Sequence, residues 1–241
     1  MTTTTNPSTN PIAATGALHP RGRLPGTLVV AGFATFLVVV VVLHVVQHDK
    51  DPRHNWVSDY ANGRGGWLLT IAFLGAATGL FGLALGINRC VRPSRPRTVA
   101  IVAFAIASLA TVASGVCASD PPRADGTVGY TTVGAIHDLS GLVGGLAVLV
   151  GLFALARACR RDPAWERTAG IVRLFAVLFV VGLITEIVIG ELSTVGPDGD
   201  GVTGVAQRID LAITMTGAIL LGLRLYNSPR YADLHTDGAA A

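Results

Sequence analysis

Charged residues are scarce in this chain of 241 residues, of which only 14% are charged and 51% are hydrophobic. Soluble domains carry about 25% charged residues. A deficit this large argues against an ordinary soluble protein and indicates that much of the surface faces lipid. Aromatic residues are also few, at 6%, whereas glycine is abundant with 29 residues.

Cysteine is nearly absent as well, and the three that occur lack the spacing of a metal site. Cys117 falls near one predicted membrane face, and Cys90 and Cys159 fall near the other. No pair could therefore bridge across the membrane, and a pair of Cys90 with Cys159 would lie on the reducing side. We expect three free thiols.

What the chain does contain is six apolar segments, each about the ~20 residues that span a hydrocarbon core. Only helices and closed barrels satisfy all backbone groups in lipid, and runs such as Phe36-Leu-Val-Val-Val-Val-Val-Leu43 exclude the alternating barrel pattern. We predict an all-α fold, a polytopic bundle of six transmembrane helices over residues 26–227, with disordered tails at 1–25 and 228–241. The segments are Thr27–Val46, Gly66–Ile87, Val99–Cys117, Val133–Ala156, Ala169–Ile189 and Val205–Leu225.

The arginines set the expected orientation, because loops rich in Lys and Arg stay in the cytoplasm. Thirteen of the 18 Lys and Arg residues flank one end of the predicted bundle, mainly in the loops after the second and fourth segments. We expect a multi-pass protein of the cell membrane with both termini cytoplasmic. Arginines that flank membrane helices are typical of topology signals and of contacts with anionic lipid, so we expect membrane lipids and no nucleic acid as partners.

Glycines form rows on two of the predicted helices. The pairs Gly75/Gly79, Gly82/Gly86 and Gly141/Gly145 have the small-xxx-small spacing of close helix contacts. We interpret both rows, including Gly144, as tight packing surfaces.

Ionisable side chains inside membrane helices are costly and are therefore candidates for function. In this chain they gather near the outer ends of four helices, while the inner half is almost purely apolar. The loop 47–65 adds further polar groups to this layer, and we infer an outward-facing polar pocket capped by that loop. The ionisable residues of the layer are His44, His137, Asp138, Glu186, Glu191, Arg208 and Asp210.

Four interpretations of this layer remain open. In the first interpretation, the charged groups pair with one another and hold the helix ends together. Arg208 would pair with Glu186 or Asp120, and His137 with Asp59. Alternatively, His44 and His48, at i and i+4, hold a metal with a third ligand from His137, Asp138 or Glu186.

The third interpretation is catalysis, in which His137 and a carboxylate of Asp59, Asp138 or Glu186 perform acid–base chemistry on a lipid or other amphiphile. The fourth is a proton- or ion-coupled pathway, which should also place ionisable groups at the midplane or inner half. The sequence contains no phosphate-cradling glycine loop and no histidines facing each other at two depths for haem, so we expect no cofactor. Whether the protein self-associates stays open.

Several motifs in order resemble one known family. They are Val57-Ser-Asp-Tyr-Ala-Asn-Gly-Arg-Gly-Gly-Trp-Leu68, Gly115-Val-Cys-Ala-Ser-Asp-Pro121, Gly134-Ala-Ile-His-Asp138, Gly204-Val-Ala-Gln-Arg208 and the loop Arg160-Arg-Asp-Pro-Ala-Trp165. In these the chain resembles the bacterial and archaeal membrane family catalogued as domain-of-unknown-function 998, over about residues 25–226.

The resemblance implies a six-helix membrane fold and points to Ser58, Asp59, Asp120, His137, Gln207 and Arg208, but it supplies no reaction. With Glu186 and Asp210 from the polar layer, these residues form the expected binding pocket. We expect a protein that binds a lipid or membrane partner there, with a membrane-embedded enzyme as the alternative.

Overall fold

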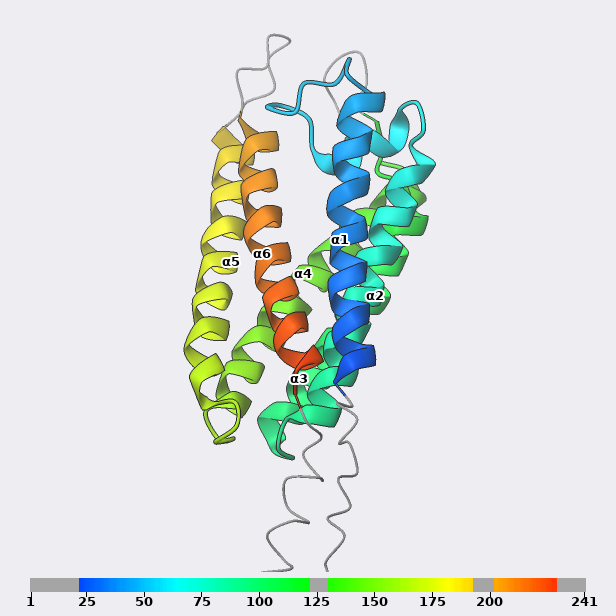
Figure 1. Ribbon diagram of the computed structural model, residues 1–241. Coiled ribbons are helices and arrows are strands. Elements are labelled where there is room, and N and C mark those ends of the chain that lie inside the picture. The colour runs from blue at the N-terminus through cyan, green and yellow to red at the C-terminus, as the bar shows by residue number, and fades with distance from the viewer. Residues whose placement is uncertain (1–21, 122–129, 193–201, 229–241) are drawn as a thin grey trace, which may run out of the picture.

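Six long helices, each apolar enough to span a membrane, make up almost all of the computed structural model, which describes residues 22–121, 130–192 and 202–228 (Figure 1). No strand occurs in the described ranges, so the predicted all-α membrane bundle is confirmed. The predicted order of the segments also holds, and as predicted the third helix is the shortest and the fourth the longest. The elements are α1 (Arg23–Val46), η1 (Val57–Asn62), α2 (Trp67–Cys90), α3 (Arg95–Val116), α4 (Thr132–Cys159), α5 (Glu166–Leu192) and α6 (Thr203–Tyr226).

The helices extend a few residues beyond most of the predicted segments. At α1 the predicted boundary was wrong, because Arg23, Leu24 and Pro25 form the first turn and Pro25 is buried. Proline fits there, since the first N–H groups of a helix have no partner within the helix. The rest of the predicted N-terminal tail, and the C-terminal tail after Ser228, lie outside the described residues.

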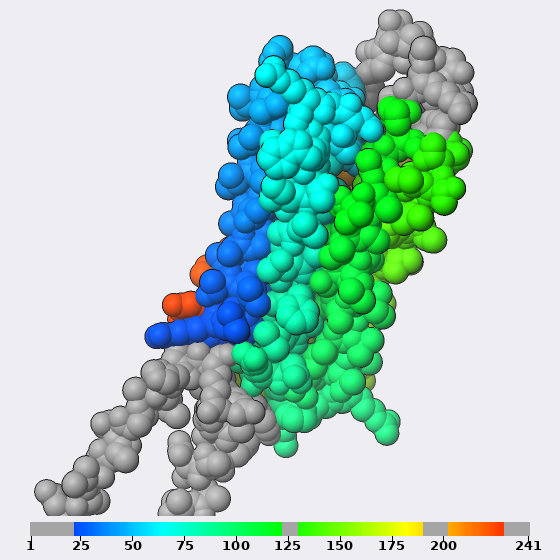
Figure 2. Space-filling view, turned by 90° about the vertical axis from the view of Figure 1, so that its right-hand side faces the viewer, coloured from blue at the N-terminus to red at the C-terminus, as the bar shows by residue number. Residues whose placement is uncertain are grey.

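The helices form a closed ring in chain order. Each packs against its neighbours in sequence, and α6 completes the ring by packing against α1 (Figure 1). In the view of Figure 2, α1, α2, α3 and α4 pack side by side and form one continuous surface. We call the end with residues 47–66 and the first turns of α2, α4 and α6 the polar end, and the opposite end the arginine-rich end.

Close packing by the α2 glycines is confirmed. A Cβ at Gly32 of α1 would collide with the backbone of Gly75 and Gly79, and one at Gly79 would lie 2.7 Å from the Phe33 ring. On α4 the prediction was wrong for Gly141 and Gly145, whereas Gly144 is buried and faces Ala110 of α3. A Cβ at Gly141 would meet nothing within 4 Å, and one at Gly145 would meet only Phe179, at 4.0 Å.

The arginine-rich end is held together by side chains of the α4–α5 connection and of α6. Trp165, between α4 and α5, is 2% exposed and donates its Nε1–H to the Cys90 carbonyl at 2.9 Å. The Arg224 guanidinium of α6 covers the Trp165 ring at 4.6 Å and donates to the Ala164 carbonyl. Buried Asp162 accepts the backbone N–H of Arg92 at 2.8 Å, which ties the α4–α5 connection to the α2–α3 connection.

Towards the polar end the ring loosens on one side. On α5, Ala169, Val172 and Ala176 are buried, whereas none of the described side chains from Val177 to Ile189 is. In Figure 1, α4 starts behind α1 and α2 and crosses to meet α5 only near the arginine-rich end. The two helices therefore diverge as they approach the polar end.

Candidate functional site

The segment that connects α1 to α2 covers the polar end of the bundle and is tied to α6. The backbone N–H of Val57 donates to Gln207 Oε1 at 2.7 Å, and Thr203 Oγ1 donates to the His54 carbonyl at 3.1 Å. The backbone N–H of Gly204 donates to the Arg53 carbonyl at 3.0 Å. The sequence predicts a cap here but not η1, whose short 3₁₀ turn presents Val57 and Ser58 to the interior.

The same segment is fastened to α1 and to the end of α3. Gln47 Nε2 donates to the carbonyls of Tyr60 and Arg64, at 2.8 and 3.0 Å. Ser119 Oγ donates to the Ser58 carbonyl at 3.0 Å, and Asn62 Nδ2 donates to the Ser119 carbonyl. With anchors on α6 and just beyond the ends of α1 and α3, the segment is a fixed cap.

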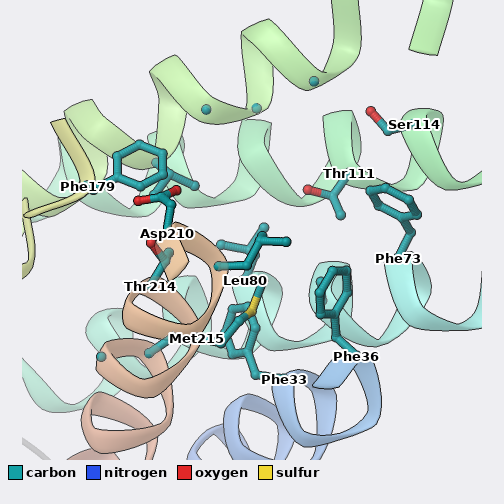
Figure 3. Close-up of a pocket in the computed structure, with 18 of the residues that line it drawn as sticks. Phe33, Phe36, Phe73, Leu80, Thr111, Ser114, Phe179, Asp210, Thr214 and Met215 are labelled. Atoms are coloured by element: carbon teal, nitrogen blue, oxygen red, sulfur yellow. The ribbon is translucent and has the colours of Figure 1, made fainter. Parts of the chain in front are cut away.

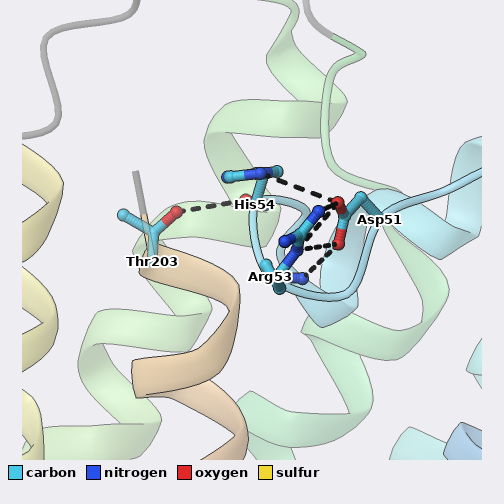
Figure 4. A network of polar contacts seen from close by, with 4 residues as sticks. All are labelled: Asp51, Arg53, His54 and Thr203. Carbon is cyan, nitrogen blue, oxygen red and sulfur yellow. Dashed lines mark hydrogen bonds and ion pairs between the residues drawn. The ribbon is translucent and has the colours of Figure 1, made fainter. Parts of the chain in front are cut away.

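Asp51, Arg53 and His54 form an exposed cluster on top of this cap, next to Thr203 (Figure 4). Arg53 Nη2 contacts Asp51 Oδ2 at 2.7 Å, and His54 Nε2 lies 3.6 Å from the same oxygen. Hydrogen bonds from the Arg53 side chain and backbone lower the pKa of Asp51 to about 2. The cluster faces water and contacts no part of the interior cavity described below.

Arg208 is bound without a carboxylate among its described contacts. Its Nε donates to His44 Nε2 at 2.8 Å, and its Nη1 donates to the carbonyls of Asn55 and Gly204, both at 2.8 Å. His44 Nδ1 faces the Val40 carbonyl at 2.6 Å, so Nδ1 carries the proton and Nε2 accepts. The Arg208 pairing with Glu186 or Asp120 expected from the sequence is replaced by this link between α6, α1 and the cap.

His137 is buried and held by the backbone. Its Nδ1 lies 2.9 Å from the Ser114 carbonyl and 2.8 Å from the Cys117 carbonyl, and its ring packs edge-on against Phe73. These contacts join α4 to the end of α3. The expected partner Asp59 is instead used by η1, where its carboxylate accepts the backbone N–H of Trp56 at 2.8 Å. Burial raises the pKa of Asp59, and the hydrogen bonds from Trp56 and Asn55 partly oppose that shift.

Two further candidate acids lie near the start of α4. The Asp120 carboxylate accepts the backbone N–H and the hydroxyl of Thr131 at the start of α4, at 2.7 and 2.6 Å. Asp138 is exposed on α4. Glu191 belongs to α5, but its side chain lies outside the described part of the chain.

The metal interpretation finds no support in the geometry of the described residues. His44 Nε2 already accepts from Arg208, and His48 is exposed in the turn after α1. Within the described ranges, no three His, Cys, Asp or Glu side chains are grouped as a metal site would require.

The centre of the ring holds a cavity of about 320 Å³ with a largely apolar wall (Figure 3). It is lined by aromatic rings of α1, α2, α3 and α5, by aliphatic side chains of α2, α4 and α6, and by the α4 glycines. Polar groups are concentrated in the part nearer the polar end: Ser58, Thr111, Ser114, His137, Ser140, Gln207, Asp210 and Thr214.

The cavity reaches the molecular surface beside α4. Gly141 lines the cavity and is itself exposed, and Gly145, one turn further, is half-buried. Phe179 of α5 lines the facing side, at the level where α5 has no buried residue. The α4 glycines therefore widen the cavity where α4 and α5 diverge.

Asp210 and Thr214, one turn apart on α6, contribute polar oxygens to the wall of this cavity. Asp210 is 7% exposed, and neither its Oδ1 nor Thr214 Oγ1 has a hydrogen-bond partner among the described residues. Figure 3 shows both side chains beside Phe179. Gly182 of α5 makes room for the Asp210 carboxylate, and Glu186, one turn after Gly182, lies on the same face of α5.

Of the eight pocket residues expected from the sequence, Ser58, His137, Gln207 and Asp210 line the cavity, and Glu186 is not among its described lining residues. Asp59, Asp120 and Arg208 instead fasten the cap and the helix ends. Sequence reasoning missed Thr214, Ser140 and the cavity-lining role of the α4 glycines. Thr214 was detectable, because it lies four residues after Asp210 and therefore on the same helix face.

Comparison with known proteins gives a family and no activity. A family described as "Protein of unknown function (DUF998)" matches residues 30–224 of this chain. No curated protein and no solved structure matches it. The chain belongs to the DUF998 family, and the resemblance noted in its motifs is confirmed.

Proposed function

We propose that this integral membrane protein binds the hydrocarbon chain of a membrane amphiphile in its central cavity. The observation that carries the proposal is the cavity itself, about 320 Å³ in volume, apolar along most of its wall and open beside α4. Ligand sites are typically concave, predominantly apolar and supplied with a few placed polar groups, with volumes of about 300–1,000 Å³.

The cavity is long in the direction of the helices. Gln207 and Leu221 of α6 both line it, and a rise of 1.5 Å per residue separates them by roughly 21 Å. One leaflet provides about 15 Å of hydrocarbon, half of the ~30 Å core. The cavity therefore has the length to hold an extended chain, with its polar groups placed for the head of the molecule.

The diverging side of the ring supports entry from the membrane. The cap lies over the polar end of the bundle, whereas Gly141 of α4 both lines the cavity and is exposed. A lipid or other amphiphile can pass sideways through this opening without exposing its chain to water.

The arginines support an orientation with the polar end outside the cell. The described residues place Arg89, Arg92, Arg95, Arg157, Arg160 and Arg161 near the opposite end, and cytoplasmic loops carry the excess of such residues. In this orientation the amphiphile binds from the outer leaflet of the cell membrane.

Binding fits the site better than catalysis or transport does. An acid–base enzyme requires a carboxylate within hydrogen-bond reach of His137. The described contacts of the His137 ring are two carbonyls and Phe73. A coupled transporter would place polar groups along both halves of the pathway, and the wall towards the arginine-rich end consists of side chains such as Leu83, Leu152 and Leu221.

The proposal is tested by mass spectrometry of the amphiphile that remains bound after purification in mild detergent. The variant Gly141→Leu/Gly145→Leu fills the cavity with side chains whose first atoms meet no closer neighbour than Phe179, at 4.0 Å. We expect the wild-type protein to retain a single-site amphiphile and the double variant to lose it.

Gly170→Leu is the matched control, since a Cβ at Gly170 also meets nothing within 4 Å but Gly170 does not line the cavity. It should retain the amphiphile. Equal retention by the wild-type protein and the double variant, with both folded, would show that the bound molecules lie elsewhere.

A further inference from the structure

In the polar part of the cavity, the side chains present more hydrogen-bond acceptors than donors to a ligand. His137 Nδ1 faces two carbonyl oxygens, so it carries a proton, and in the neutral ring Nε2 is an acceptor. The hydroxyls of Thr111, Ser114 and Ser140 already donate to backbone carbonyls of their own or neighbouring helices. A ligand that donates hydrogen bonds therefore suits this wall.

The strongest acceptor is Asp210. The residue is more than nine-tenths buried and lines the cavity, and within the described part of the chain neither its Oδ1 nor Thr214 Oγ1, one turn away, has a hydrogen-bond partner. A buried acceptor without a partner destabilises the folded state, and a charged one does so more strongly. A donor supplied by a ligand would remove that destabilisation.

No protein cation balances this acid in the described part of the cavity. Its described lining contains no lysine or arginine. Arg208, two residues before Asp210, is directed to His44 and to the cap. Glu186, one turn after Gly182, adds a second acidic group on the face of α5 that packs against Asp210.

We propose that the cavity selects amphiphiles with a protonated amine, and that Asp210, supported by Glu186 and Thr214, binds the ammonium group. This inference rests on the proposed function and adds the chemical class of the ligand. The ammonium donates to Asp210 Oδ1 and Thr214 Oγ1 and places a positive charge next to the two acids. Its chain then runs along α6 towards Leu221.

Three single-chain probes of equal length test the proposal: dodecylamine, dodecanol and dodecanoate. A primary amine is protonated at neutral pH, as the lysine side chain is. Dissociation constants are obtained by displacement of a fluorescent dodecanol analogue from the full-length protein in nanodiscs. We expect the amine to bind at least about tenfold more tightly than the alcohol, and the carboxylate to bind most weakly.

Asp210→Asn keeps the shape of the side chain and removes its charge. It should abolish the preference for amine over alcohol while leaving alcohol binding within about threefold. Asp138→Asn, which changes an exposed acid on α4, should leave the preference unchanged. If Asp210→Asn does not fold, Glu186→Gln replaces it, and a preference lowered in that variant supports the proposal.

The outcomes separate this inference from the function on which it rests. Tight binding of all three probes without preference for the amine, or a preference unaltered by Asp210→Asn or by Glu186→Gln, would overturn the ammonium site and leave chain binding standing. Failure of every probe to displace the fluorescent analogue specifically would overturn both. Competition by lysophosphatidylethanolamine, compared with its trimethylated counterpart, shows whether a lipid head group or a free amine supplies the ammonium.

Discussion

The two ends of this bundle are built differently. At the arginine-rich end, Trp165, Arg224 and Asp162 connect the α2–α3 and α4–α5 connections with α6. At the polar end, α1, α2, α3 and α6 are joined by the cap, whereas α4 and α5 diverge and expose Gly141. One end holds the ring together, and the other leaves one side of it open.

The comparison indicates that one end of the bundle supplies stability and the other holds the candidate site. Because the arginine-rich end already holds the ring together, α5 can lie at the periphery: only 11% of its most apolar stretch is buried, compared with 56% for α2. A helix with so few buried side chains is a suitable side wall for an opening to the membrane. We therefore expect substitutions at the two ends to have different effects.

The largest effect is expected at the arginine-rich end, for Trp165→Ala. The change removes a buried aromatic side chain, its hydrogen bond to the Cys90 carbonyl and the surface under Arg224. We expect a loss of about 3–5 kcal/mol in the free energy of unfolding, measured by denaturant titration in mixed micelles. Trp67→Ala, at an exposed position of the polar end, should cost less than about 1 kcal/mol.

Next in size is Arg208→Ala at the polar end. It removes the hydrogen bonds that join α6 to His44 and to the Asn55 carbonyl. We expect a loss of about 2 kcal/mol and faster proteolysis within residues 47–66. Arg208→Lys should restore little, because an ammonium cannot reproduce the forked geometry of the guanidinium. Cleavage at the wild-type rate would contradict the role of Arg208 in fastening the cap.

Much of this architecture could be predicted from the sequence. The features that could not be predicted were missed for one common reason. The six helices follow from runs of apolar residues, and the gathering of polar groups at one end follows from their positions along those runs. The spacing of Gly141 and Gly145 is the same as that of Gly75 and Gly79, but spacing defines a helix face and not what lies opposite it.

The same limit applies to the candidate site. Asp59 and Arg208 were placed correctly at the polar end, but their partners are a backbone N–H three residues away and a neutral histidine on another helix. Such partners depend on the conformation of the cap, which has no periodic pattern. The contacts of Trp165 depend likewise on how two connections meet.

A smaller effect distinguishes the two glycine rows. Gly141→Ala should raise the free energy of unfolding by about 0.5–1 kcal/mol, because the added Cβ meets nothing and alanine favours the helix. Gly79→Ala should lower it by about 1–3 kcal/mol, because the Cβ would lie against Phe33. The same sign for both substitutions would contradict the assignment of the α4 row to the cavity wall.

The smallest effect is expected on the exposed surface of the cap. The pKa of Asp51 is lowered from 3.8 to about 2 by Arg53, so its contribution is present above the unfolded value and is lost as the pH falls towards 2. Because the pair is exposed, Asp51→Asn should leave Tm nearly unchanged between about pH 8 and pH 5. A large, pH-dependent shift of Tm in that range would show that the cluster supports the cap more than its exposure suggests.

The most direct test of the central claim uses a lipid with a photoactivatable group on its acyl chain, cross-linked to the protein in membranes and mapped by mass spectrometry. We predict adducts on cavity residues such as Leu80, Met215 and Phe179, and their loss in Gly141→Leu/Gly145→Leu but not in Gly170→Leu. Adducts confined to outward-facing side chains such as Leu109 and Val181 in the wild-type protein would contradict a chain-binding cavity.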